Sequence, residues 1–145
     1  MNITIHRGAH QIGGCITEIS TDGAKIIIDL GSNLPGVGVD DMATDEAIAR
    51  ITHDAYGVFY THYHGDHVGL FDKVPSYIPQ YIGKGAKEVM KRKHEELHQS
   101  EKVEIIRGFK TYVANSPINI KGKILITPYY VSHSAFDAYM FKIEI

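Results

Sequence analysis

The stretch Thr61–Gly69 carries the side chains of this chain that are best suited to chemistry, because it places three histidines and one aspartate within six positions. Imidazole nitrogens and carboxylate oxygens are the donors that zinc and similar borderline metals take in proteins, at roughly 2.0–2.2 Å. A lone surface histidine is usually just solvated, whereas four such side chains at one junction indicate a shared cation. The stretch therefore predicts a metal site with the ligands His62, His64, Asp66 and His67.

A strand must present these ligands. The apolar run Tyr56–Tyr60 directly precedes them and predicts a buried strand. Side chains two residues apart on a strand point the same way, so His62 and His64 can aim at one point from its carboxyl end. Gly65 then allows the backbone to turn sharply into the next segment.

Three further residues could contribute to the site. Asp29 lies near the carboxyl end of the apolar run Ala24–Gly31. A buried carboxylate must be hydrogen-bonded or lie near positive charge. It either closes the turn that follows or orients a metal-bound histidine. His133 follows an apolar strand and precedes small residues, as a metal ligand at a strand end would. This context alone does not decide whether His133 binds the metal. His10, in a glycine-rich turn, is a weaker candidate.

A family resemblance adds to this reading. His62–His67 matches, in order and spacing, the HxHxDH signature of the metallo-β-lactamase superfamily. The resemblance implies an α/β (α+β) fold, the αββα sandwich, with a hydrolase site for one or two metals. Asp29 matches the family's first motif, and His133 matches its third. The segment His133–Ala138, HSAFDA, looks most like the ribonuclease J and β-CASP nuclease branch.

The resemblance covers only the first half of a complete family member. The superfamily places a metal-bridging aspartate and a further metal-binding histidine beyond the His133 element, and Ile145 precedes both. We therefore expect residues 1–145 to form a single partial domain, with one metal on three histidines and a weaker second position on Asp66 and His67 alone. An open sheet edge predicts a homo-oligomer, or a partner chain that supplies the missing half.

Composition limits the class of protein. A formal charge of −2 argues against a general polyanion binder, although a local basic face remains open. No apolar run is long enough for a membrane span, and the N-terminus lacks the apolar region of a signal peptide. The single Cys15 can form no internal disulfide, so a cytoplasmic, reducing location is the default expectation.

The remaining segments predict the elements around the site. Alternating or apolar runs predict strands over residues 2–6, 15–20, 24–30 and 138–145, and a hairpin over 118–128. Helical periodicity is clearest over Lys84–Gln99, while Val103–Val113 predicts strand or loop. Pro79 confines Ser76–Ile82 to an edge or irregular position.

The helix predicted over Lys84–Gln99 allows two functional interpretations. Five basic residues against Glu88 in its first half form either a solvated face or a contact for a phosphate backbone. His94 and His98 have a spacing compatible with zinc, but no acidic third ligand accompanies them. The sequence therefore favours a single metal centre elsewhere.

Together these features predict a metal-dependent hydrolase, most simply a phosphodiesterase or exonuclease-like nuclease that acts on RNA. Zinc, as one or two ions, is the expected cofactor, with manganese as the alternative. The catalytic residues would be Asp66, which holds or deprotonates the water, His67, which completes the second metal position, and Asp29, which orients the ligands. A small-molecule hydrolase of thioesters, lactones or cyclic nucleotides, and a catalytically silent metal-binding module, stay open. For the isolated chain we expect metal binding with slow turnover or none.

Overall fold

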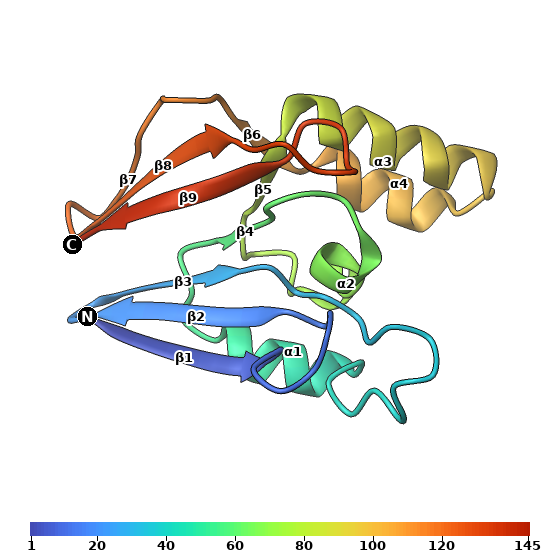
Figure 1. Ribbon diagram of the computed structural model, residues 1–145, viewed down its shortest axis with the longest axis horizontal. Coiled ribbons are helices and arrows are strands. Elements are labelled where there is room, and N and C mark those ends of the chain that lie inside the picture. The colour runs from blue at the N-terminus through green and yellow to red at the C-terminus, as the bar shows by residue number, and fades with distance from the viewer.

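The computed structural model describes residues 1–145 as three layers, in which helices cover one face of a large sheet and a smaller sheet covers the other (Figure 1). The large sheet has the strand order β1 (Asn2–Arg7), β2 (Ile16–Thr21), β3 (Ala24–Ile28), β4 (Val58–Phe59), β5 (Gln80–Gly83) and β6 (Lys110–Tyr112). The small sheet has the order β7 (Ile118–Ile120), β8 (Ile124–Tyr130) and β9 (Tyr139–Glu144). The helices are α1 (Asp45–Thr52), α2 (Gly65–Val68), the 3₁₀ helix η1 (Phe71–Lys73), α3 (Lys84–Glu96) and α4 (Ser100–Arg107).

Two apolar clusters hold the layers together. On β3, Ile27 belongs to the cluster shared with the helices, whereas Ile26 belongs to the cluster between the two sheets, and both side chains are fully buried. This burial on both faces explains the uninterrupted apolar run of β3, since a strand covered on both sides has no polar face. Strands β1 to β3 pair antiparallel, and β3 to β6 pair parallel.

The predicted hairpin over 118–128 and the predicted strand over 138–145 are confirmed, and together they form the small sheet. Strands β7 and β8 form the expected hairpin, and Lys121 and Gly122 at its tip both have positive φ, as a tight two-residue turn requires. Strand β9 pairs antiparallel with β8 from Leu125 to Tyr130. The loop between β8 and β9 carries His133.

Two sequence expectations were met only in part. Val103–Val113 was predicted as strand or loop, and Lys110–Tyr112 is the strand β6. Ser100–Arg107, however, is the helix α4, because Val103 and Ile106 lie three apart and turn the same face towards the core.

Pro79 was predicted to confine Ser76–Ile82 to an edge or irregular position. It lies in the irregular stretch just before β5, but β5 itself is an interior strand. At this position its missing N–H costs nothing, and its carbonyl accepts from Val58 N at 3.0 Å.

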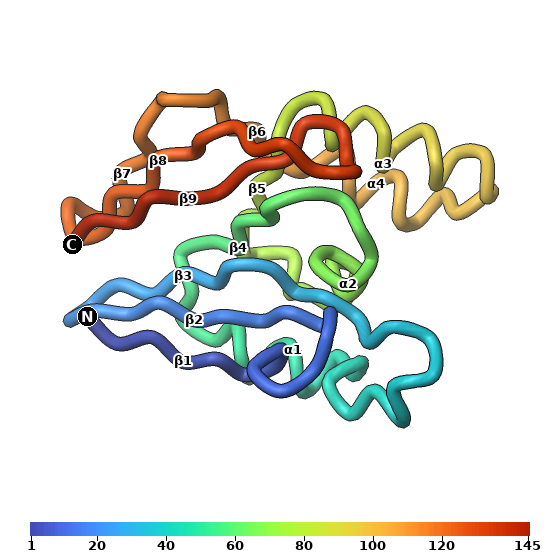
Figure 2. Tube along the Cα trace, in the orientation of Figure 1, coloured from blue at the N-terminus to red at the C-terminus, as the bar shows by residue number.

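The architecture brings several strand ends to one side. The tube in Figure 2 shows the carboxyl ends of β3 and β4, helix α2 and the loop between β8 and β9 at the same side of the two sheets. The N- and C-termini lie at the opposite side (Figure 1). No helix has the length and apolar character that a membrane crossing requires.

Candidate metal centre

Backbone contacts with the neighbouring strand ends hold the histidine-rich turn in place. Cys15 N donates to Asp66 O at 3.0 Å, and Leu30 N donates to His67 O at 2.8 Å. The approach is so close at Gly31 that an added Cβ would lie 1.7 Å from Asp66 O. Only glycine fits there, so the turn and the end of β3 form one rigid unit.

Gly65 does not have the role that the sequence predicted for it. It is the first residue of α2, is not among the glycines with positive φ, and has room for a Cβ, with Ser32 Oγ the nearest atom at 3.8 Å. The tight positions in this region are Gly31 and Gly69, where an added Cβ would lie 2.4 Å from Gly65 O. The sequence showed a glycine in the turn but could not show which glycine another chain segment approaches.

Three histidines converge at this end of the molecule. One ring nitrogen from each of His62, His64 and His133 can be chosen so that all three atoms lie within 4.8 Å of one another. The Nε2 atoms of His62 and His133 are 3.2 Å apart, although 71 residues separate them in the chain. The structure thus brings together the three-histidine set that the family resemblance implied.

Asp29 is buried behind these rings. Its carboxylate accepts hydrogen bonds from Thr61 N at 2.8 Å, from Thr61 Oγ1 at 2.9 Å and from His67 Nδ1 at 2.8 Å. Burial raises the pKa of Asp29, and the bonds from His67 and Thr61 oppose that rise. Its backbone adopts a positive φ of 59°, which directs the chain from β3 into the loop beside the turn. Asp29 therefore lies where it can orient the histidines, as predicted.

Thr61 links Asp29 to His62, a contact that the sequence did not predict. Its hydroxyl donates to Asp29, so its oxygen can accept from His62 Nδ1, which lies 2.9 Å away. This places the proton of a neutral His62 on Nδ1 and leaves Nε2 with a free lone pair, directed at His133. The only sequence signal was a hydroxyl residue directly before the first histidine.

The electrostatics of the cluster suit a cation. Burial, together with the neighbouring rings of His67, His133 and His64, lowers the pKa of His62 to about 4. His62 is therefore a neutral imidazole at physiological pH, which is the form that binds metals.

Asp66 and His67 lie beside this cluster rather than inside it. The His67 ring is 4.2 Å from the His62 ring between centroids, and His67 Nε2 is 3.7 Å from Asp66 Oδ2. Burial alone would lower the pKa of His67, but the hydrogen bond to Asp29 and the charges of Asp29 and Asp66 raise it. These two residues provide two donors for a second ion, fewer than the three of the main cluster.

The loop that carries His133 is closed by one backbone bond, from Val131 N to Ala138 O at 3.1 Å, and is otherwise held mainly by side chains. Asp137 accepts from Gly85 N at 2.7 Å, from Ala86 N at 3.0 Å and from Tyr139 OH at 2.7 Å. The carboxylate thereby caps the first turn of α3 and ties the loop to it.

The remaining candidates have other environments. His10 is exposed and stands apart from the three-histidine group. His94 is buried, with Nδ1 2.5 Å from Gln99 Oε1, so it serves the packing between α3 and α4 rather than a zinc site. Lys87 on the basic helix donates to the carbonyls of Arg107 and Phe109, which is a structural role.

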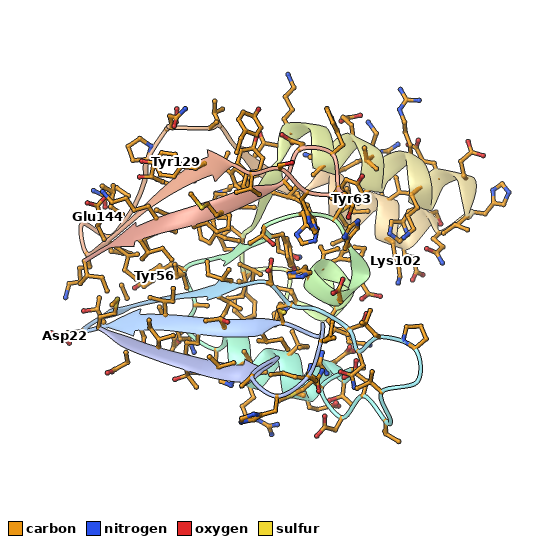
Figure 3. The ribbon with its side chains drawn as sticks, viewed as in Figure 1. Asp22, Tyr56, Tyr63, Lys102, Tyr129 and Glu144 are labelled. Carbon is orange, nitrogen blue, oxygen red and sulfur yellow. The ribbon has the colours of Figure 1, made fainter.

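The cluster borders a cavity of about 500 Å³ that opens between the two sheets. Asp29, His62, His67 and His133 contribute its polar part. Tyr63 separates His62 from His64 in the chain. Figure 3 shows its place in space, which is between α2 and the loop that joins β8 and β9. A small molecule or the end of a longer one can therefore reach the histidines.

The donor set fits a divalent metal. Around a tetrahedral zinc ion with bonds of about 2.0–2.1 Å, two nitrogens lie about 3.4 Å apart. The His62–His133 separation of 3.2 Å agrees with that value. At this distance one Nε2–H can donate to the other Nε2, and a metal ion would take the place of that proton.

Comparisons with known proteins identify the fold. No family model and no curated protein matches the sequence. A protein of unknown function from Enterococcus faecalis V583 superposes with a TM-score of 0.74 over 98% of this chain and 40% of its own length, at 24% identity. MEM-A1, a subclass B3 metallo-β-lactamase from a soil metagenome library, has a TM-score of 0.63 over 90% of this chain and 51% of its own length, at 14% identity. A diphosphatase from the PhnP family has a TM-score of 0.58 over 90% of this chain and 49% of its own length, at 20% identity.

These likenesses confirm the predicted fold class. The chain has a metallo-β-lactamase-like α/β fold and spans 40% to about half of the length of these three structures. At identities below 25% the agreement concerns the fold alone. The structures named here include metallo-hydrolases, and they do not single out the ribonuclease J branch.

Proposed function

We propose that this chain carries the metal centre of a metal-dependent hydrolase that cleaves phosphodiesters, with RNA as the substrate. The observation that supports this most directly is the convergence of His62, His64 and His133, with Asp66 and His67 beside them. The fold shared with a diphosphatase and with metallo-β-lactamases supports the hydrolase class. The resemblance of the segment His133–Ala138 to nucleases of the β-CASP branch supports the RNA substrate.

The metal would be zinc, or manganese, held by the three histidines, with a second ion at Asp66 and His67. Such an ion supplies Lewis acidity, which polarises a phosphoryl oxygen and makes water a better nucleophile at neutral pH. The protein supplies the orientation. Asp29 and Thr61 keep the Nδ1 proton of His62 away from the metal side of the ring.

Asp66 is the group that would handle the proton of the attacking water. Its carboxylate is partly buried next to His67, where it can accept a hydrogen bond from water and then the proton itself. His67 stays bound to Asp29 through Nδ1, which leaves Nε2 directed towards Asp66. These two residues are the proposed catalytic pair, and Asp29 holds one of them in place.

Metal content and turnover of the 145-residue chain test the proposal. We expect at least one zinc or manganese per chain by mass spectrometry of the purified protein, and slow, metal-dependent hydrolysis of 5′-phosphorylated RNA. The His62→Ala/His133→Ala double variant should lose both, whereas His10→Ala, which changes an exposed histidine, should lose neither. Metal binding without any hydrolysis would mean that the chain by itself is only a metal-binding module, and it would not support the hydrolase proposal. No metal binding would refute the site.

We also propose that the chain associates with a second copy, or with a separate chain that completes the fold. Strand β1 lies at an edge of the large sheet with Ile3 58% and Ile5 55% exposed, and β9 lies at an edge of the small sheet with Met140 57% exposed. Unpaired strand edges with apolar side chains favour association. Light scattering should give a mass above 16.2 kDa, and a monomer at all concentrations would contradict self-association.

A further inference from the structure

Phe136 is a large apolar side chain that is held in place and yet left open to solvent. Its side chain is 68% exposed, although it lies three residues after His133. Its backbone N donates to Tyr63 OH at 3.1 Å, and its ring lies so close to Gly85 that a Cβ there would approach the ring to 2.6 Å. One side of the ring therefore rests on the start of α3, and the rest faces solvent.

More aromatic surface adjoins this ring. Phe136, Tyr130 and Tyr139 line one cavity of about 430 Å³ at the start of α3. Tyr130 is 66% exposed and stacks on Tyr139 with 4.6 Å between ring centroids. The stacking fixes the Tyr130 ring, so the cavity has two ordered aromatic surfaces rather than two mobile side chains.

Among the charged side chains that line this cavity, only Lys84 has no bonding partner. Glu88 contributes to the lining, but its carboxylate is bound by Lys91 at 2.6 Å. The Asp137 carboxylate is occupied by two backbone amides and the hydroxyl of Tyr139. Lys84 also lines the cavity, is exposed, and forms no ion pair. The cavity therefore combines stacking surfaces with one available ammonium group.

This cavity adjoins the metal centre through Tyr63. The hydroxyl of Tyr63 binds the Phe136 backbone, while its ring lies 5.7 Å from the His64 ring between centroids. A ligand that stacks on Phe136 can therefore have another part close to the histidines.

We propose that Phe136, Tyr130 and Lys84 form a base-binding subsite for the nucleotide next to the phosphodiester that the metal centre cleaves. This inference rests on the function proposed above and specifies its substrate as single-stranded nucleic acid. A nucleobase stacks on an exposed aromatic ring whatever its identity, and an ammonium group neutralises the neighbouring phosphate. The subsite predicts little base preference, because only ring faces and one point charge define it.

Binding without metal separates this subsite from catalysis. A ¹H–¹⁵N NMR titration of the metal-free 16.2 kDa chain compares adenosine 5′-monophosphate with ribose 5-phosphate, which lacks the base. We expect the nucleotide to shift the amide signals of Phe136 and Lys84 and to bind about fivefold or more tightly than the sugar phosphate.

Three variants identify the groups that act. Phe136→Ala should remove the difference between the two ligands, and Phe136→Trp should keep it. Lys84→Ala should weaken the binding of both ligands. The matched controls are Tyr77→Ala, which removes an aromatic residue that is 74% exposed elsewhere, and Lys93→Ala, which removes an exposed lysine further along α3; both should bind as the unchanged chain does.

The outcomes distinguish the two proposals. Equal affinity for both ligands, or an unchanged preference in Phe136→Ala, would overturn the subsite even if the chain hydrolyses RNA. Base-dependent binding in a chain that hydrolyses no phosphodiester would support the subsite and reject the proposed function. Circular dichroism of Phe136→Ala should show an unchanged fold, because the side chain is mostly exposed.

Discussion

The two segments that supply the metal ligands are held in different ways. The turn His62–His67 is bound through backbone amides and carbonyls to the ends of β2 and β3, with Gly31 pressed against it. The loop that carries His133 has backbone bonds only at its base, where Val131 N donates to Ala138 O and Tyr139 N to Thr61 O. Beyond its base the loop is bound through side chains, chiefly Asp137 on the start of α3 and Tyr63 on the Phe136 backbone. Backbone anchoring makes the turn part of the fold, whereas side-chain anchoring leaves the loop adjustable by single substitutions.

The largest effect should follow from the turn's closest contact. Gly31→Ala would place a Cβ 1.7 Å from Asp66 O, so the backbone must move, and we expect the free energy of unfolding to fall by about 3 kcal/mol or more. Urea unfolding measures this. Gly65→Ala in the same turn is the control, because its Cβ has room, and it should change stability by less than about 1 kcal/mol. Similar losses in the free energy of unfolding for the two variants would contradict the anchoring of the turn through its backbone.

Removing the ligand of the loop should affect metal binding and not folding. In His133→Ala one of three donors is lost, so zinc affinity should fall by roughly 100-fold or more, while the exposed position keeps the stability of the metal-free chain within about 1 kcal/mol. Competition with a chromophoric chelator gives the affinity. The exposed His98→Ala is the matched control. An unchanged zinc affinity in His133→Ala would show that the loop does not bind the metal.

Asp29 adds a side-chain anchor to the turn, because it binds both Thr61 and His67. Asp29→Ala leaves these donors unpaired, so we expect zinc affinity to fall about 10- to 100-fold and the free energy of unfolding by about 1–3 kcal/mol. Chelator competition and urea unfolding measure the two effects. Asp45→Ala, at an aspartate that is 80% exposed, should change neither. A loss of stability without a loss of affinity would confine Asp29 to a structural role.

The smallest effect should come from the loop anchor. Asp137→Ala removes the cap on α3 and should cost about 1 kcal/mol of stability and at most about tenfold in zinc affinity. Asp137→Asn keeps an oxygen acceptor and should therefore keep most of the stability and most of the zinc affinity. The visible spectrum of the cobalt-loaded chain reports directly on the coordination of His133. An identical spectrum in Asp137→Ala would mean that the loop is held without this side chain.

Much of the fold could be predicted because its signals are local. The alternation in β1 and β9, the apolar run of β3 and the turn at Lys121–Gly122 each lie within a few residues. The prediction failed for α4, whose short apolar pattern fits a strand as well as a helix until its packing is known. The irregular stretch at Pro79 was predicted, but the interior place of β5 after it was not, because edge and interior positions depend on which strands pair.

The sequence by itself determined which residues of the turn carry donors. It also indicated that His62 and His64 could aim at one point, although β4 ends at Phe59, before both of them. Only the tertiary structure decided that His133 comes within 3.2 Å of His62, that Thr61 connects Asp29 to the first histidine, and that Gly31 rather than Gly65 is the position without room. The physical reason is that side-chain direction is a property of the local backbone. Close approach between distant segments arises only when the two sheets and α3 pack together.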